Sequence, residues 1–192
     1  MKILVVGESG VGKSTSIYGY KHKKLPRNLL PATIGIDIVA FKNSDNTTAA
    51  HVYDVGGMSM YKCIINEHLR GIAVDAIIIM YDSTVQKEAD LHGSVFEWWT
   101  VVHSTINHDT NVPVYIVGNN YRVGAKIPQC LNSVLGYKYV KHSFINGYTG
   151  LNVKEMFGAV LANRAPQPCP KQRQSRIEPP SPVTPDRKTC CF

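Results

Sequence analysis

Three short, nearly continuous apolar runs limit the folds open to this chain more than any other feature. They occupy residues 3–6, 76–81 and 114–118. Runs of this length without polar alternation are typical of central strands that are buried on both faces of a mostly parallel sheet. A sheet of that kind needs helices on both of its faces, so the pattern predicts an α/β fold.

The segments between these runs supply the remaining strands and the helices of such a fold. We expect strands at residues 3–6, 34–42, 49–54, 76–81, 114–118 and 138–144, and helices at residues 13–23, 64–70, 86–105, 128–135 and 153–162. A polar turn at residues 43–46 separates the second strand from the third and predicts an antiparallel hairpin. The expected sheet is therefore six-stranded and mostly parallel, with one antiparallel edge strand.

A change in composition near Ala165 divides the chain into two parts. Prolines crowd the segment after it, at Pro166, Pro168, Pro170, Pro179, Pro180, Pro182 and Pro185. Because proline interrupts helices and sheet ladders, we expect a globular domain over residues 1–164 and an extended basic tail over residues 165–192. We expect no transmembrane helix and no signal peptide, since no apolar run has the required length or flanks.

A glycine-rich motif follows the first predicted strand and opens the first predicted helix. Its sequence matches GxxxxGK[ST] in full, in the strand-to-helix context that a P-loop requires. Successive backbone N–H groups and the helix N-terminus then point at phosphate oxygens. Lys13 would reach the outer phosphates and Ser14 would bind Mg²⁺. The predicted phosphate-binding residues are Gly7, Glu8, Ser9, Gly10, Val11, Gly12, Lys13, Ser14 and Thr15.

A second motif with phosphate chemistry ends the third predicted strand. It is the segment Asp54-Val55-Gly56-Gly57. In a phosphoryl-transfer site Asp54 would hold the magnesium shell, directly or through water, and Gly57 would offer a backbone N–H to the terminal phosphate. Asp54 and Asn119 both fall at the carboxyl ends of predicted strands, where open α/β sheets bind their ligands.

Several further segments resemble the Rab branch of the Ras-like GTPases, over roughly residues 1–163. Residues 33–38 resemble the first switch sequence TIGIDF, and residues 54–71 align without gaps to the second switch. The other matching segments are Tyr81-Asp82-Ser83-Thr84, Trp99, Val117-Gly118-Asn119 and Thr149-Gly150-Leu151-Asn152-Val153.

This resemblance implies a small-GTPase fold that binds GTP or GDP with Mg²⁺. The implied magnesium residues are Ser14, Thr33 and Asp54, and the implied base contacts are Asn119 and the backbone of Gly147. The implied protein partners are effectors and regulators that contact both switches, and the implied role is a switch in vesicle and membrane traffic.

The base-recognition residues depart from the family pattern at three places. The family sequence NKxD is here Asn119-Asn120-Tyr121-Arg122, and the sequence SAK is here Asn146-Gly147-Tyr148. The switch I aromatic that stacks on guanine corresponds to Leu25. Arg122 is a donor only, so it cannot accept the two hydrogen bonds that guanine offers to the family's aspartate. Loss of that partner predicts weaker guanine discrimination.

The family glutamine that orients the attacking water corresponds to Met58. A thioether is a poor acceptor, so we expect slow GTP hydrolysis. The alternative function is a pseudo-GTPase that occupies Rab effectors or regulators without a normal nucleotide cycle. The apolar segment Met58-Ser59-Met60-Tyr61 fits an effector surface or closure over the vacated glutamine position.

The net charge of +7 suits a phosphate-binding protein with a basic tail, and we expect no nucleic-acid partner. Near the end of the chain, Cys190 and Cys191 resemble the double-prenylation signal of Rab proteins. Two lipid chains would hold the protein on a membrane where one gives only marginal binding. We therefore expect a lipid-anchored protein on the cytoplasmic face of an intracellular membrane, with a cytosolic fraction.

Overall fold

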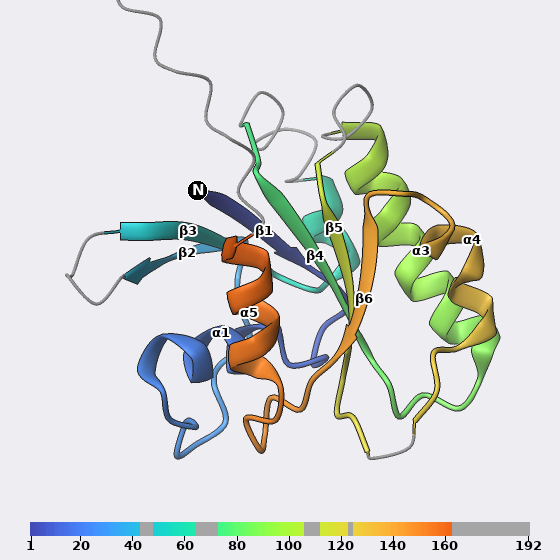
Figure 1. Cartoon of the computed structure of the whole chain (residues 1–192). Helices are drawn as coiled ribbons and strands as arrows, with labels where there is room; N and C mark the ends of the chain where they lie inside the picture. Colours follow the sequence, from blue (N-terminus) through green and yellow to red (C-terminus); the bar gives the residue numbers. More distant parts are fainter. Residues whose placement is uncertain (43–47, 64–72, 106–111, 123–124, 163–192) are drawn as a thin grey trace, which may run out of the picture.

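The first strand of the chain lies in the middle of the sheet. The computed structural model describes residues 1–42, 48–63, 73–105, 112–122 and 125–162. The strands, in the order β2-β3-β1-β4-β5-β6, form a single six-stranded sheet (Figure 1). Their bounds are β1 (Lys2–Val6), β2 (Ile36–Lys42), β3 (Thr48–Val55), β4 (Ala76–Asp82), β5 (Val114–Asn119) and β6 (Val140–Phe144).

The predicted sheet topology is confirmed. Strand β1 pairs in parallel with β3 on one side and with β4 on the other. The pairs β4–β5 and β5–β6 are also parallel, whereas β2 pairs antiparallel with β3 and forms one edge. The carboxyl ends of β1, β3, β4 and β5 consequently meet along one rim of the sheet, where a ligand site is expected.

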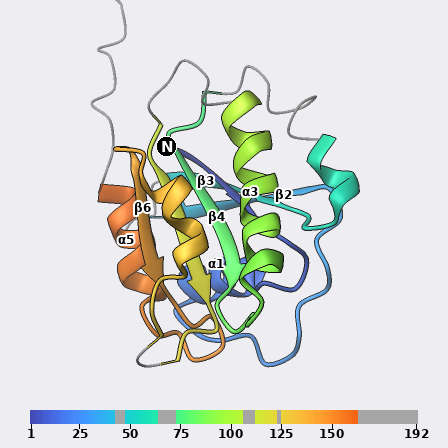
Figure 2. The same ribbon diagram turned by 90° about the vertical axis from the view of Figure 1, so that its right-hand side faces the viewer.

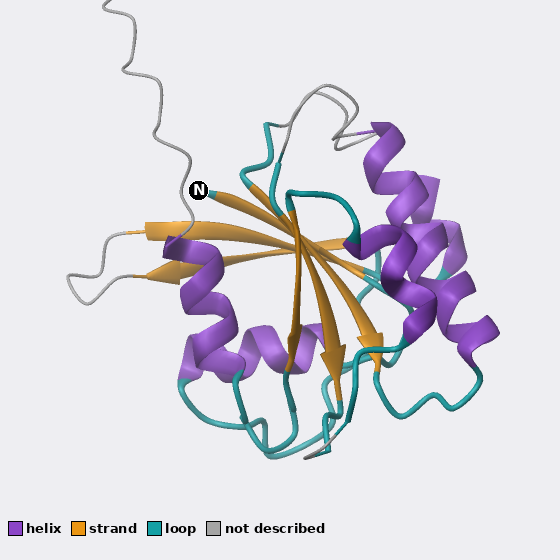
Figure 3. Cartoon of the chain, turned by 45° about the vertical axis from the view of Figure 1, so that its right-hand side comes forward, coloured by secondary structure: helices purple, strands orange, loops and turns teal. Residues whose placement is uncertain are grey.

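Helices cover both faces of this sheet (Figure 3). Figure 2 looks onto the side that α3 covers. The helices are α1 (Lys13–His22), α3 (Glu88–Thr105), α4 (Asn132–Leu135) and α5 (Val153–Ala162), with single 3₁₀ turns η1 (Ser59–Tyr61) and η2 (Gln129–Leu131). None of the helices in the described ranges combines the length and the apolar character that a membrane crossing requires.

Alternating side chains of β1 pack into two separate apolar cores. Leu4 and Val6 belong to the core under α3 and α4, while Ile3 and Val5 belong to the core under α1 and α5. This division follows from the two-residue repeat of a strand. It explains why the run of residues 3–6 is apolar at every position.

Several predicted boundaries are wrong by a few residues. The second strand begins at Ile36 rather than at residue 34, because the chain turns at Gly35, whose carbonyl accepts the backbone N–H of Gly56. The last strand begins at Val140 rather than at residue 138, because the Val140 N–H closes a turn onto the Tyr137 carbonyl.

One helix prediction needs a larger correction, and other predictions lie outside the described residues. The helix expected over residues 128–135 is instead the turn η2 followed by the four-residue α4, because the Leu131 N–H bonds to the Pro128 carbonyl in a 3₁₀ turn and the α-helix begins only at Asn132. Trp98 and Trp99 of α3 are both buried. The helix expected over residues 64–70 and the tail after residue 162 fall outside the described residues.

Candidate functional site

The loop between β1 and α1 wraps tightly around the start of the helix. Gly12 precedes α1 with φ of 89°, and no side chain caps the helix N-terminus. A Cβ atom on Gly12 would lie 2.1 Å from Nδ2 of Asn119, so a larger residue does not fit there. The uncapped first-turn N–H groups and the positive end of the helix therefore face the loop, as in anion-binding sites.

Lys13 lies at the centre of this loop. Its ammonium donates to the carbonyl oxygens of Gly7 and Glu8, at 2.8 Å each. Burial lowers the pKa of Lys13, while the charges of Asp54 and Glu8 oppose that change. The positive charge is thus held by the loop's own backbone, close to the space where an outer phosphate would lie.

Three oxygen-bearing side chains from separate segments converge beside Lys13. The Ser14 hydroxyl donates to Oδ2 of Asp54 at 2.5 Å, and it lies 2.9 Å from the Thr33 hydroxyl. Thr33 also donates to Asp54 Oδ2, at 3.4 Å. The family resemblance implies that these three residues bind magnesium, and the structure brings all three within hydrogen-bonding distance.

The Asp54 carboxylate has the character of a cation ligand. Asp54 is only 2% exposed, and its second oxygen, Oδ1, is buried without a hydrogen-bond partner among the described residues. Burial raises the pKa of this carboxyl, and the Ser14 hydrogen bond and the Lys13 charge oppose the rise. A carboxylate with two neighbouring hydroxyls is an oxygen donor set that suits Mg²⁺, and a buried oxygen with no partner fits that ion or its bound water.

A cavity of about 250 Å³ opens in front of these groups. Its wall combines the phosphate loop and the start of α1 with the segment that carries Thr33. The lining residues are Ser9, Gly10, Gly12, Lys13, Ser14, Thr15, Leu29, Leu30, Pro31, Ala32, Thr33, Gly57, Met58 and Tyr148. Most of the residues predicted to hold phosphates therefore border one cavity.

The segment after β3 is pressed against the phosphate loop. A Cβ atom on Gly57 would lie 2.3 Å from the Ser9 nitrogen and 2.5 Å from the Glu8 carbonyl oxygen, so only glycine allows this approach. Met58 lines the cavity and is 43% exposed, while Met60 is 65% exposed. Met58 therefore lies where it could close over the position of the family glutamine. Met60 lies on the surface, where an effector could contact it.

On the side expected to face the base, Asn119 joins three segments. This buried amide donates from Nδ2 to the Val11 carbonyl at 2.7 Å and accepts the Gly147 N–H at 2.8 Å. Arg122 is exposed, and it does not line the cavity. Tyr148, in contrast, lines the cavity next to the phosphate loop. The loop that carries Gly147 and Tyr148 is therefore fixed to the phosphate loop through a single side chain.

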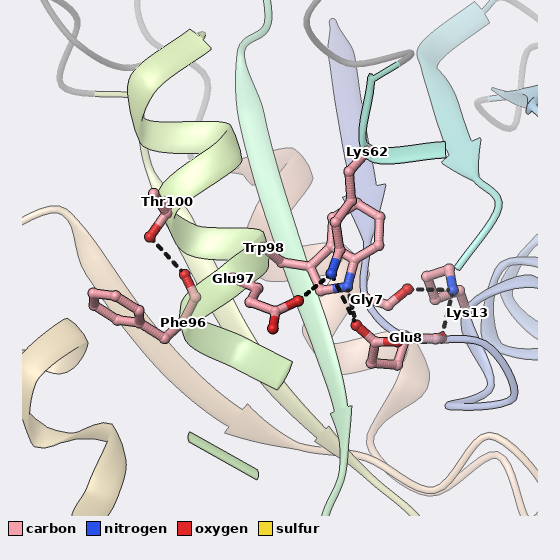
Figure 4. Close-up of polar contacts among 8 residues, drawn as sticks. All are labelled: Gly7, Glu8, Lys13, Lys62, Phe96, Glu97, Trp98 and Thr100. Carbon is pink, nitrogen blue, oxygen red and sulfur yellow. Dashed lines mark hydrogen bonds and ion pairs between the residues drawn. The ribbon is translucent and has the colours of Figure 1, made fainter. Parts of the chain in front are cut away.

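The Glu8 side chain belongs to a polar network that sequence reasoning missed (Figure 4). Trp98 Nε1 donates to Glu8 Oε1 at 2.9 Å, and Lys62 Nζ lies 3.5 Å from the same oxygen. Lys62 also pairs with Glu97 and lies over the Trp98 ring, 5.1 Å from its centroid. No sequence signal could have found this network, since Glu8 and Trp98 are 90 positions apart and only the fold brings them together.

The strand–loop–helix cradle, its lysine and the adjoining oxygen cluster define a P-loop nucleotide-binding protein. Comparison with known proteins narrows the class: residues 2–163 match the model of the Ras family. The chain belongs to the Ras family, and its similarity to Rab and Ypt proteins confirms the Rab-type resemblance.

Three relatives illustrate that similarity. The chain is 30% identical over 121 residues to the Ras-related protein SEC4 of Candida albicans, covering 62% of this chain and 54% of SEC4. It is 31% identical over 120 residues to the Ras-related protein Rab-11A of Dictyostelium discoideum, covering 62% of this chain and 52% of the relative. It is 27% identical over 165 residues to the GTP-binding protein ypt2 of Schizosaccharomyces pombe, covering 82% of this chain and 77% of ypt2. The chain thus spans about half the length of SEC4 and Rab-11A.

Proposed function

We propose that this protein is a Rab-like GTP-binding switch in membrane traffic, with weak intrinsic GTP hydrolysis. The observation that carries the proposal is the convergence of Ser14, Thr33 and Asp54 beside the loop-held ammonium of Lys13. This arrangement combines a phosphate cradle with a cation site in one cavity. A nucleoside diphosphate or triphosphate with its magnesium ion needs both.

Each group has a distinct part in that proposal. Lys13 and the loop N–H groups bind the outer phosphates, and Ser14, Thr33 and Asp54 hold Mg²⁺, which neutralises phosphate charge. Gly57 brings the segment after β3 close enough to the phosphate loop to respond to a terminal phosphate. Met58 offers only a poor acceptor to an attacking water, so hydrolysis is slow.

The exposed apolar residues near the cavity supply a surface for effectors and regulators. Ile34, one residue after Thr33, is 82% exposed, and Met60 is 65% exposed. Both lie in segments that border the cavity, because Thr33 and Gly57 are part of its wall. A bound triphosphate would order these segments and present the surface.

Membrane attachment is a separate element of the proposal. Double prenylation of Cys190 and Cys191 would place the protein on the cytoplasmic face of an intracellular membrane. Mass spectrometry of protein from its native cell should show both thiols modified. Free thiols at both positions would refute the lipid anchor and leave the nucleotide switch unaffected.

Nucleotide binding is tested with a fluorescent GTP analogue and the full-length chain. We expect magnesium-dependent binding that GDP competes and that Lys13→Ala abolishes, while Lys126→Ala, which removes an exposed charge outside the cavity, leaves it unchanged. Equal competition by ATP would show lost base preference. Absence of any nucleotide binding would overturn the switch and support the pseudo-GTPase alternative.

A further inference from the structure

A second and larger cavity lies away from the phosphate site. It has a volume of about 770 Å³ and is bounded by the end of α1, strand β2 and the start of α5. Figure 1 shows α1 and α5 side by side next to β2. The two cavities have no lining residue in common. Its volume falls in the range of protein ligand pockets. The lining includes Leu25 and Gly147, which correspond to base-contact positions of the family, but the aromatic floor and the lysines of the cavity have no part in the proposed switch.

The floor of this cavity is apolar and aromatic. Phe41 is only 2% exposed, and Val153 and half-buried Tyr20 lie beside it. The Tyr20 ring centroid lies 4.7 Å from that of Phe41. Leu25 adds a partly exposed aliphatic side chain at the margin. The floor therefore suits an aromatic or aliphatic group, whose burial is favourable, and offers little to a polar one.

The rim of the cavity is strongly basic. Lysines from three separate segments surround the floor, namely Lys21, Lys23, Lys24, Lys42 and Lys154. No aspartate or glutamate is among the described lining residues. Lys23 has the left-handed backbone φ of 53°, uncommon for a residue with a side chain, and this turn carries the chain from α1 along the rim. Like charges gathered around one hollow create a field that favours an anionic ligand.

We propose that this basic pocket binds an acidic segment of a partner protein, which inserts one apolar anchor side chain between the lysines. The concave shape and the buried floor favour a protruding side chain over a flat membrane surface. The apolar floor favours a peptide over a small polyanion, since phosphate groups gain nothing from Phe41 and Val153. Carboxylates on both sides of an anchor match a basic rim around an apolar centre.

The probe is a fluorescein-labelled peptide with a central phenylalanine flanked on both sides by glutamates, titrated into the full-length chain. Gly19→Leu tests the pocket itself. Gly19 lines the cavity within α1, and a Cβ atom built on it meets no atom within 4 Å. A leucine side chain there projects from the cavity wall and its Cβ meets no neighbour, so we expect peptide affinity to fall by about tenfold or more. Gly93→Leu is the matched control, since Gly93 in α3 has equally open space.

Charge reversal separates a specific site from general attraction. Lys24→Glu with Lys154→Glu changes two rim residues, whereas Lys126→Glu with Lys138→Glu changes two exposed lysines elsewhere by the same net charge. We expect a loss of about tenfold or more for the rim pair and less than about twofold for the control pair. Equal losses for both pairs, or unchanged binding by Gly19→Leu, would overturn the proposal.

Three further probes identify the occupant. A peptide with alanine in place of the phenylalanine should bind at least about tenfold more weakly, because it lacks the anchor. Inositol hexakisphosphate and phosphatidylserine vesicles should not use this cavity. Gly19→Leu should therefore leave any binding of these two probes unchanged. If Gly19→Leu weakens the binding of either, or if the alanine peptide binds equally well, the acidic anchor segment is refuted. Because the titration requires no bound nucleotide, its result is independent of the proposed switch.

Discussion

The indole nitrogen of Trp98 donates a 2.9 Å hydrogen bond to the carboxylate of Glu8, which joins helix α3 to the phosphate loop. The same carboxylate oxygen lies 3.5 Å from Lys62, in the segment that follows Gly57 and Met58. Three segments distant in the sequence therefore meet at one carboxylate (Figure 4). An acidic side chain in a phosphate-binding loop would repel phosphate. Here Trp98 and Lys62 hold the Glu8 carboxylate toward α3 instead.

Removing the indole donor should weaken both the fold and the phosphate site. We expect Trp98→Phe to lower the free energy of unfolding by roughly 2 kcal/mol, because a hydrogen bond to a charged group is lost from a buried position. We also expect bound GDP to dissociate several-fold faster, since the phosphate loop loses its tie to α3. Urea denaturation and release of a fluorescent GDP analogue measure the two effects.

The matched control for that change is Trp99→Phe. Trp99 is also buried on α3, but it packs against Tyr137 and Tyr139 rather than against the phosphate loop. The Trp99→Phe variant should be less stable than the unmodified protein, but it should release GDP no faster. Equal release rates for the two variants would show that the Trp98 hydrogen bond does not tighten the nucleotide site.

Restoring a water acceptor at Met58 should accelerate hydrolysis. Met58 borders the cavity beside Gly57, where the family glutamine orients water. We expect Met58→Gln to raise the single-turnover rate of GTP hydrolysis by about tenfold or more. Met60→Gln changes an exposed methionine in the same segment and should leave the rate unchanged. A Met58→Gln rate equal to that of the unmodified protein would mean that another group limits hydrolysis.

Guanine preference should respond to an acceptor at position 122. Arg122→Asp supplies the carboxylate that guanine N–H groups require, and we expect the preference for GDP over ADP to rise by about tenfold or more. Arg122→Ala removes the same positive charge without adding an acceptor, so its preference should stay near that of the unmodified protein. Competition against a fluorescent GDP analogue measures both. A similar gain in the alanine variant would show that charge alone, and not hydrogen bonding, sets the preference.

The half-buried His142 should make stability depend on pH below neutrality. Its ring lies 2.9 Å from the Tyr81 hydroxyl, and burial lowers the pKa of His142 from 6.5 to about 4. The folded protein then binds this proton more weakly than the unfolded chain does. The free energy of unfolding is therefore unaffected above about pH 6.5, falls as the pH drops toward 4, and levels off below that.

Between pH 7 and pH 5 this loss amounts to about 2 kcal/mol. Urea denaturation at both pH values measures it. His142→Gln removes the titrating ring and keeps a polar side chain beside Tyr81, so the difference between the two pH values should shrink by that amount. An unchanged difference in the variant would show that other groups cause the acid sensitivity.

The sequence predicted the parts of the fold that depend on local pattern. The apolar runs gave the central strands because burial on both faces leaves no polar position, and the phosphate motif located the loop and the start of α1. The convergence of Thr33 and Asp54 on Ser14 was predicted through the family resemblance, since nothing local to Thr33 identifies it.

The remaining features depend on contacts that are set only by tertiary structure. Lys62 carries no signal in the sequence, because its partners Glu8 and Glu97 become neighbours only when α3 packs on the sheet. The basic pocket is similarly invisible, since Phe41 and Lys154 are distant in the chain. Helix α4 was predicted too long because the residues between Pro128 and Gly136 do not reveal that the first turn of this segment is 3₁₀.

The central place of β1 has a consequence for how the protein is made. Lys2 pairs with His51 in β3, and Ile3 pairs with Ala76 in β4. The first strand therefore has both of its neighbours only after β4 has emerged from the ribosome. Until then Leu4 and Val6 lack most of their core, whose other buried residues come from Val55 onwards. Pairing over such sequence distances is slow, and nascent chains of this protein are therefore expected to need chaperone protection during synthesis.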